Sequence, residues 1–128
     1  MKKAISLIAI VMLLSFIVYV NVYNGFAKPQ SITIQKFDEP FGEGTTIMDK
    51  KEISSVIGIF NRANYLRNVE YKLAKQPTYK IRLNNQDGES EIIHIYEEFD
   101  KKTTLLISLE RGYFKINTKQ SNKIIELY

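Results

Sequence analysis

The N-terminal segment of the chain is a long, uncharged apolar run. Lys2 and Lys3 precede the run, which extends from Ala4 to Val20 without a charged residue. About 20 apolar residues match the roughly 30 Å hydrocarbon core of a bilayer, and a helix satisfies its backbone groups internally. The sequence therefore predicts an N-terminal transmembrane helix. The two lysines favour a cytoplasmic N-terminus, so everything after Lys28 is expected outside the cytoplasm.

A cleaved signal peptide is the alternative interpretation of residues 1–27. Gly25–Ala27 has the small-x-small pattern of a cleavage site, and cleavage after Ala27 would release a secreted protein. The apolar run is longer than the roughly 7–15 residues typical of a signal peptide. Tyr19, Tyr23 and Phe26 near its end favour a membrane interface, where amphipathic rings are stable. The chain has no cysteine, which excludes a lipid-modified anchor.

The rest of the chain has the composition of one ordered and weakly charged domain. Residues 28–128 hold all 14 acidic residues and all but two of the 18 Lys and Arg, so their net charge is about +2. The excess basic residues are interspersed with acidic ones and do not form the basic clusters of a nucleic-acid surface, so no nucleic-acid partner is expected. We expect a short linker at residues 28–30, followed by a monomeric domain over residues 31–128 that is held together by packing alone.

The clearest helix signal outside the N-terminus starts at Asp49. Asp49 and Glu52 form the D-x-x-E pattern of a capping box. Apolar residues then recur every three or four positions and make one stripe. The stripe consists of Ile53, Val56, Ile57, Phe60 and Ala63. This pattern predicts a helix from Lys50 to about Ala63.

Five segments in which apolar and polar residues alternate predict five strands. They are Ser31–Phe37, Pro77–Leu83, Glu91–Tyr96, Thr103–Glu110 and Tyr113–Ile116. Loops are expected at 38–46 and around Asp87-Gly88, while residues 64–76 read as a partly ordered connection. Asn117 or Thr118 is expected to cap a final helix. The order β-α-β-β-β-β-α indicates an α+β domain, with a four- to five-stranded, mainly antiparallel sheet and helices on one face.

The polar residues that invite a functional interpretation each have a structural explanation. His94 is the only histidine, and a lone histidine in a strand makes no conventional metal site or triad. Glu97, Glu98 and Asp100 lack the spacing of a calcium loop, so we interpret them as part of a solvated turn. Gly42–Gly44 lacks the lysine and helix of a phosphate loop. No catalytic, cofactor-binding or metal-binding residue is therefore assigned, and no cofactor is expected.

Aromatic residues on neighbouring predicted strands suggest a further hypothesis. Tyr79, Tyr96, Tyr113 and Phe114 could gather on one face of the sheet. Ordinary sheet packing explains them, and an aromatic protein-binding face is the functional alternative.

Three segments carry a resemblance to a known family. They are ITIQKFD, TTIMDKKEISSVIGIFNRA and PTYKIRLNNQDGESEIIHIY, within residues 31–128. In these segments the chain resembles the YhfM-like domain of small exported or membrane-attached proteins of Bacillus and relatives. The resemblance implies a fold but no activity, because the family is uncharacterised, and it transfers no functional residue.

The sequence favours a non-enzymatic module anchored in the cell membrane by its N-terminal helix, with the C-terminal domain outside. Its expected partners are the membrane and a protein or another envelope component. Two alternatives stay open. One is a secreted, inhibitor-like module released after Ala27, and the other is an enzyme whose carboxylates converge only in the folded chain.

Overall fold

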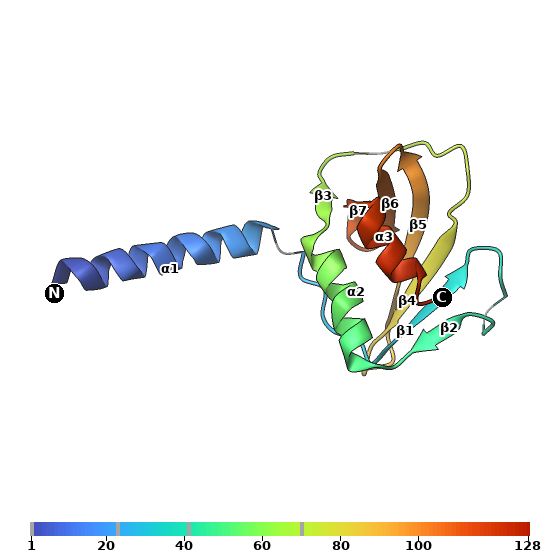
Figure 1. Cartoon of the computed structure of the whole chain (residues 1–128), viewed down its shortest axis with the longest axis horizontal. Helices are drawn as coiled ribbons and strands as arrows, with labels where there is room; N and C mark the ends of the chain where they lie inside the picture. The colour runs from blue at the N-terminus through green and yellow to red at the C-terminus, as the bar shows by residue number, and fades with distance from the viewer. Residues whose placement is uncertain (1, 23, 41, 70) are drawn as a thin grey trace.

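The computed structural model describes residues 2–22, 24–40, 42–69 and 71–128, without the side chains of Lys2 and residues 17–22. Helix α1 (Lys2–Val22) projects from a compact domain (Figure 1). The domain contains helices α2 (Lys50–Arg62) and α3 (Thr118–Ile125). Its strands are β1 (Ser31–Lys36), β2 (Thr45–Ile47), β3 (Asn64–Leu66), β4 (Tyr79–Asn84), β5 (Ser90–Asp100), β6 (Thr103–Ser108) and β7 (Gly112–Asn117).

The strands form one antiparallel sheet in the order β2-β1-β4-β5-β6-β7-β3. The α+β class is confirmed, but the seven-stranded sheet is larger than the predicted four or five strands. The two additional strands, β2 and β3, have three residues each and lie at the two edges. Three residues are too few to display an alternating pattern, which is why the sequence did not reveal them. Such short edges also discourage pairing with another chain.

Helices α2 and α3 cover one face of the sheet. Alternate residues of the strands point to that face and pack with the helices in a single core. The cluster joins Ile32, Ile34, Ile81, Ile93 and Ile95 of the central strands to the helical residues Val56, Phe60 and Ile124, among others. All five residues of the predicted stripe on α2 are buried, which confirms that prediction.

Both helices of the domain begin at the predicted caps. Asp49 Oδ1 accepts hydrogen bonds from the backbone N–H of Lys51 and Glu52, at 2.9 and 3.0 Å. Asn117 caps α3, in a reciprocal capping box with Gln120. These bonds satisfy N–H groups that a helix start would otherwise leave without partners.

Helix α1 occupies the position where the sequence predicts a transmembrane helix. In the part of the chain that the structure describes, no helix is both long and apolar enough to cross a bilayer. The described apolar side chains of α1 from Ile5 to Phe16 are nonetheless exposed, each with more than half of its surface accessible.

The segment that follows α1 is built into the domain. The Asn24 side chain donates to the carbonyls of Phe60 and Ala63, at 2.8 and 2.9 Å, at the C-terminal end of α2. Phe26 is only 4% exposed, and its backbone N–H and C=O bond to the side chain of Asn61. Further along, Pro29 is buried and the N–H of residue 30 donates to Asn84 O at 2.8 Å. Asn24, Phe26, Pro29 and residue 30 are thus held against the domain by hydrogen bonds or burial.

The two turns predicted at Asp87-Gly88 and at the acidic residues Glu97, Glu98 and Asp100 have different outcomes. Gly88 adopts a positive φ of 84° in the turn between β4 and β5, as the Asp-Gly signal predicts. The segment from Glu97 to Asp100, expected as a turn, instead continues strand β5 through an irregularity in its pairing with β6. Glu98 has a φ of 53° at this irregularity, and the turn, expected over residues 97–102, is confined to Lys101 and Lys102.

Candidate functional site

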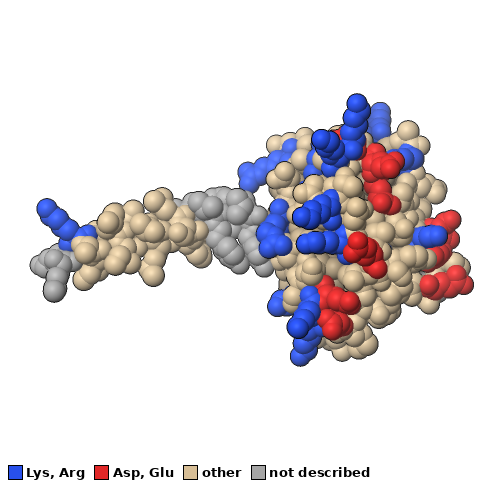
Figure 2. Space-filling view, viewed as in Figure 1, with Lys and Arg blue, Asp and Glu red and all other residues tan. Residues whose placement is uncertain are grey.

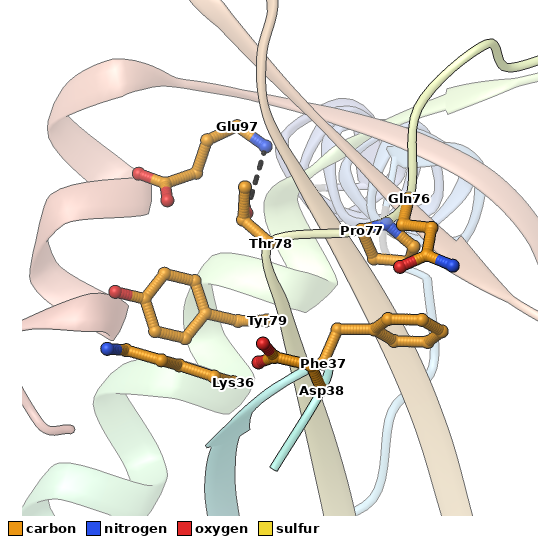
Figure 3. A pocket seen from close by; sticks show the side chains of 8 residues that line it. All are labelled: Lys36, Phe37, Asp38, Gln76, Pro77, Thr78, Tyr79 and Glu97. Atoms are coloured by element: carbon orange, nitrogen blue, oxygen red, sulfur yellow. Dashed lines mark hydrogen bonds between the residues drawn. The ribbon is translucent and has the colours of Figure 1, made fainter.

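A shallow hollow of about 380 Å³ lies where strand β1 ends and strand β4 begins. It is lined by Lys36, Phe37, Asp38, Gln76, Pro77, Thr78, Tyr79 and Glu97. Figure 3 shows Phe37, Gln76 and Pro77 on one side and Lys36 with Tyr79 on the other, with the Asp38 carboxylate between them. We call this group of residues the distal hollow, because β1 ends on the side of the domain away from helix α1 (Figure 1).

Backbone bonds fix the floor of the distal hollow. The N–H of Phe37 donates to Thr78 O at 3.2 Å, and the N–H of Thr78 donates to Ile95 O at 2.8 Å. The Thr78 hydroxyl also donates to Ile95 O at 3.0 Å. The same hydroxyl accepts from the N–H of Glu97 at 3.4 Å (Figure 3). The irregularity at the end of β5 therefore places Glu97 on the rim and ties it to the start of β4.

An aromatic contact supports the Tyr79 side of the hollow. The rings of Tyr79 and Tyr128 meet edge to face, with centroids 5.6 Å apart, and Lys36 Nζ lies 5.9 Å from the Tyr128 centroid. The Tyr128 hydroxyl donates to the Glu39 carboxylate, and this bond is the main reason that the pKa of Tyr128 rises to about 12. Tyr128 thereby links α3 and its following residues to the loop after β1.

The charged groups around the distal hollow are accessible to solvent. Lys36 and Asp38 are exposed, and Glu97 is only half-buried. The hollow is lined by one ammonium, two carboxylates and two aromatic rings, which belong to Lys36, Asp38, Glu97, Phe37 and Tyr79.

His94 lies just behind the hollow, on the face of the sheet that no helix covers. Its ring meets the ring of Phe37 edge to face at 5.5 Å, and Lys80 is its neighbour on β4. Burial, with a smaller contribution from Lys80, lowers the pKa of His94 below its usual value. Ile92, His94 and Tyr96 are every second residue of β5 and therefore lie on the same face of the sheet.

The other candidate residues do not converge. The sheet register places Tyr79 and Phe114 on the covered face and Tyr96 and Tyr113 on the opposite face, so the hypothesis of a single aromatic face is wrong. Among the described residues, no group of three metal-ligating side chains is close enough to hold an ion.

The remaining candidates have ordinary structural roles. The neighbouring Thr103 side chain lowers the pKa of Asp100, and the N–H of Lys102, which donates to the Asp100 carboxylate at 3.3 Å, lowers it further. Gly42 has a φ of 95°, which suits a turn in the loop after β1. The Asp49 side chain caps the start of α2.

Sequence reasoning missed the distal hollow. Its residues come from three segments, 36–38, 76–79 and Glu97, that are far apart in the chain. The available signal was Pro77 directly before a period-two segment, which marks a strand start, but nothing in the sequence indicated that the end of β1 lies beside it.

No protein-family model, curated protein or solved structure matches this chain.

Proposed function

We propose that this chain is a non-catalytic interaction module, tethered to the outer side of a cell membrane by helix α1 and binding a protein or envelope partner through the distal hollow. The observation that carries the proposal is the position of the hollow on the side of the domain away from the helix (Figure 1). A partner could approach this side while α1 occupies the membrane. Membership of the YhfM-like family stays a prediction.

The tether is supported by the apolar surface of α1. Large apolar side chains between Ile5 and Phe16 are exposed around the helix rather than packed against the domain. A helix that is apolar on all sides needs an apolar environment, which a domain of this size does not supply. In sequence the apolar run continues to Val20, and Lys2 and Lys3 precede it. These features favour a membrane environment and an N-terminus in the cytoplasm.

The junction after α1 favours retention of the N-terminal segment over release as a secreted protein. Cleavage after Ala27 would remove Asn24 and Phe26. The buried Asn61 side chain would then lose both of its bonds to the Phe26 backbone, and the rings of Phe60 and Phe114 would lose a neighbour. Opening a core cavity and removing two hydrogen bonds from a buried amide both destabilise a fold.

Membrane fractionation followed by N-terminal sequencing tests the tether. We expect the cell-associated protein to keep its first 27 residues and to resist extraction by high salt and alkaline carbonate. A mature chain that starts at Lys28 and accumulates in the medium would contradict the proposal and support the secreted alternative.

Site-specific photocrosslinking tests the binding role of the distal hollow. A photoreactive residue at Gln76, which is exposed on the rim, should form an adduct with a partner in intact cells. The same residue at Lys51, in the first turn of α2, is the matched control because it is also exposed and does not line the hollow. Equal adduct formation from both positions would show that the hollow has no special role.

A further inference from the structure

A second hollow, of about 240 Å³, lies between helices α2 and α3. It is lined by Ser55, Ile59, Arg62, Asn117, Lys119, Gln120 and Lys123. Three of these side chains are cations and none is an acid. We call this group the basic hollow, and its charge makes it suited to an anionic partner.

Stability of the fold does not account for these cations. Among the described residues, the ion pairs join Arg111 to Glu91 and Lys115 to Asp100, and none involves Arg62, Lys119 or Lys123. All three cations are exposed. Lys119 also lies in the first turn of α3, where the helix dipole disfavours a positive charge.

The basic hollow lies close to the base of helix α1. Arg62 is in the last turn of α2, and the carbonyls of Phe60 and Ala63 beside it accept the two bonds from Asn24. Only residue 23 separates Asn24 from the end of α1, so their Cα atoms span at most about 7.6 Å. The basic hollow is therefore next to the point where the helix enters the domain.

The distribution of charge over the domain agrees with this placement. On the face that Figure 2 shows, Lys and Arg are the charged residues beside helix α1, although they also occur at the top, the bottom and the right of the domain, where Asp and Glu lie among them. A domain tethered by α1 would thus turn a positive side towards the membrane.

We propose that the basic hollow docks onto anionic lipid headgroups of the membrane that holds helix α1. This inference rests on the proposed tether. Where the leaflet that faces the domain carries anionic lipids, each basic side chain near its surface has about a fivefold bias towards it, and salt screens the attraction. Docking would hold the domain in one orientation, with the distal hollow facing away from the bilayer.

The absence of cysteine allows a direct test with the full chain. A single cysteine at the exposed Asn122, between the two lysines of α3, can carry a nitroxide label. The labelled chain is reconstituted into vesicles of phosphatidylcholine alone or mixed with phosphatidylglycerol. Electron paramagnetic resonance then measures how readily a neutral, water-soluble nickel chelate reaches the label. Flotation of the phosphatidylcholine vesicles reports separately whether α1 holds the chain in the membrane.

We expect the label to be protected only when phosphatidylglycerol is present, and high salt to remove the protection. The variant K119Q/K123Q should lower the ratio of docked to undocked domain by about 25-fold, which is the product of two fivefold biases. The control variant K50Q/K51Q removes the same charge from the first turn of α2, about 18 Å along the helix from Arg62, and should keep the protection.

The possible failures are distinguishable. A chain that floats with the vesicles but whose label is equally accessible in both lipids would overturn the docking and leave the tether intact. Equal loss of protection in the two variants would also overturn it, because a general charge effect would then suffice. A chain that does not float with phosphatidylcholine vesicles would refute the tether, and the docking with it.

Discussion

Truncating Phe26 tests whether the segment after α1 belongs to the core of the domain. The Phe26 ring lies 5.5 Å from the ring of Phe60 and 5.7 Å from that of Phe114, and the Arg111 guanidinium stacks over it at 4.3 Å. Phe→Ala in a packed core costs about 3–5 kcal/mol. The stacked cation adds about 0.5–2 kcal/mol, so we expect Phe26→Ala to cost towards the upper end of the core range.

Urea unfolding of the full chain in detergent measures this cost. The near-ultraviolet circular dichroism follows the packing of the domain through its six tyrosines, since the chain has no tryptophan. Phe16→Ala is the matched control, because Phe16 is 63% exposed on helix α1 and outside the core. A surface substitution changes the free energy of unfolding by about 0.5 kcal/mol or less. If the free energies of unfolding of Phe26→Ala and Phe16→Ala differ by no more than this, the segment after α1 does not belong to the core, and the argument that the N-terminal segment is retained fails.

Three further predictions concern single residues. Asp49→Ala should lower the free energy of unfolding by about 0.5–2 kcal/mol in the same urea assay, because the start of α2 loses its cap; a variant as stable as the parent would refute the capping role. The pKa of His94 is lowered in the folded protein, so the stability that depends on neutral His94 is present above the unfolded pKa near 6.5 and is lost as the pH falls through the folded pKa. His94→Gln should therefore lose less stability than the parent between about pH 7 and pH 5. Equal losses of stability in the two proteins would contradict this. Glu39→Gln should lower the pKa of Tyr128 from about 12 towards the ordinary value near 10, measured by NMR titration of ¹³C-labelled tyrosine with Tyr128→Phe for assignment; an unchanged value would show that the hydrogen bond is not the cause.

Elements whose stabilising contacts are local were predictable. The cap at Asp49 and the stripe that follows lie within four turns of one helix, so the sequence displays both together. Strands β4 to β7 follow one another as hairpins, and each has enough residues for a visible alternation. Strand β3 was hidden because it has three residues and pairs with β7, about fifty positions later.

The junction after α1 was not predictable, because an apolar residue beside an anchor has two equally good explanations. Phe26 follows a membrane-like run and was grouped with Tyr19 and Tyr23 as an interfacial ring. Its role in the core depends on Asn61, which lies directly after Phe60 of the stripe and is only 2% exposed. A polar residue beside an apolar stripe was a signal that some backbone would pair with it, but its partner is 35 positions away.

The short connection between helix and domain limits which partners the proposed module can bind. A flexible linker would let a tethered domain explore a large volume, but here Asn24 is already bonded to α2 and only residue 23 precedes it after the helix. A domain of about 100 residues has a radius of gyration near 13 Å, so every part of its surface stays within a few tens of ångströms of the helix end. The distal hollow would thus remain close to the bilayer in any orientation. A partner must therefore be attached to the same membrane or reach its immediate surface, which makes membrane-associated proteins the first adducts to seek in the crosslinking experiment.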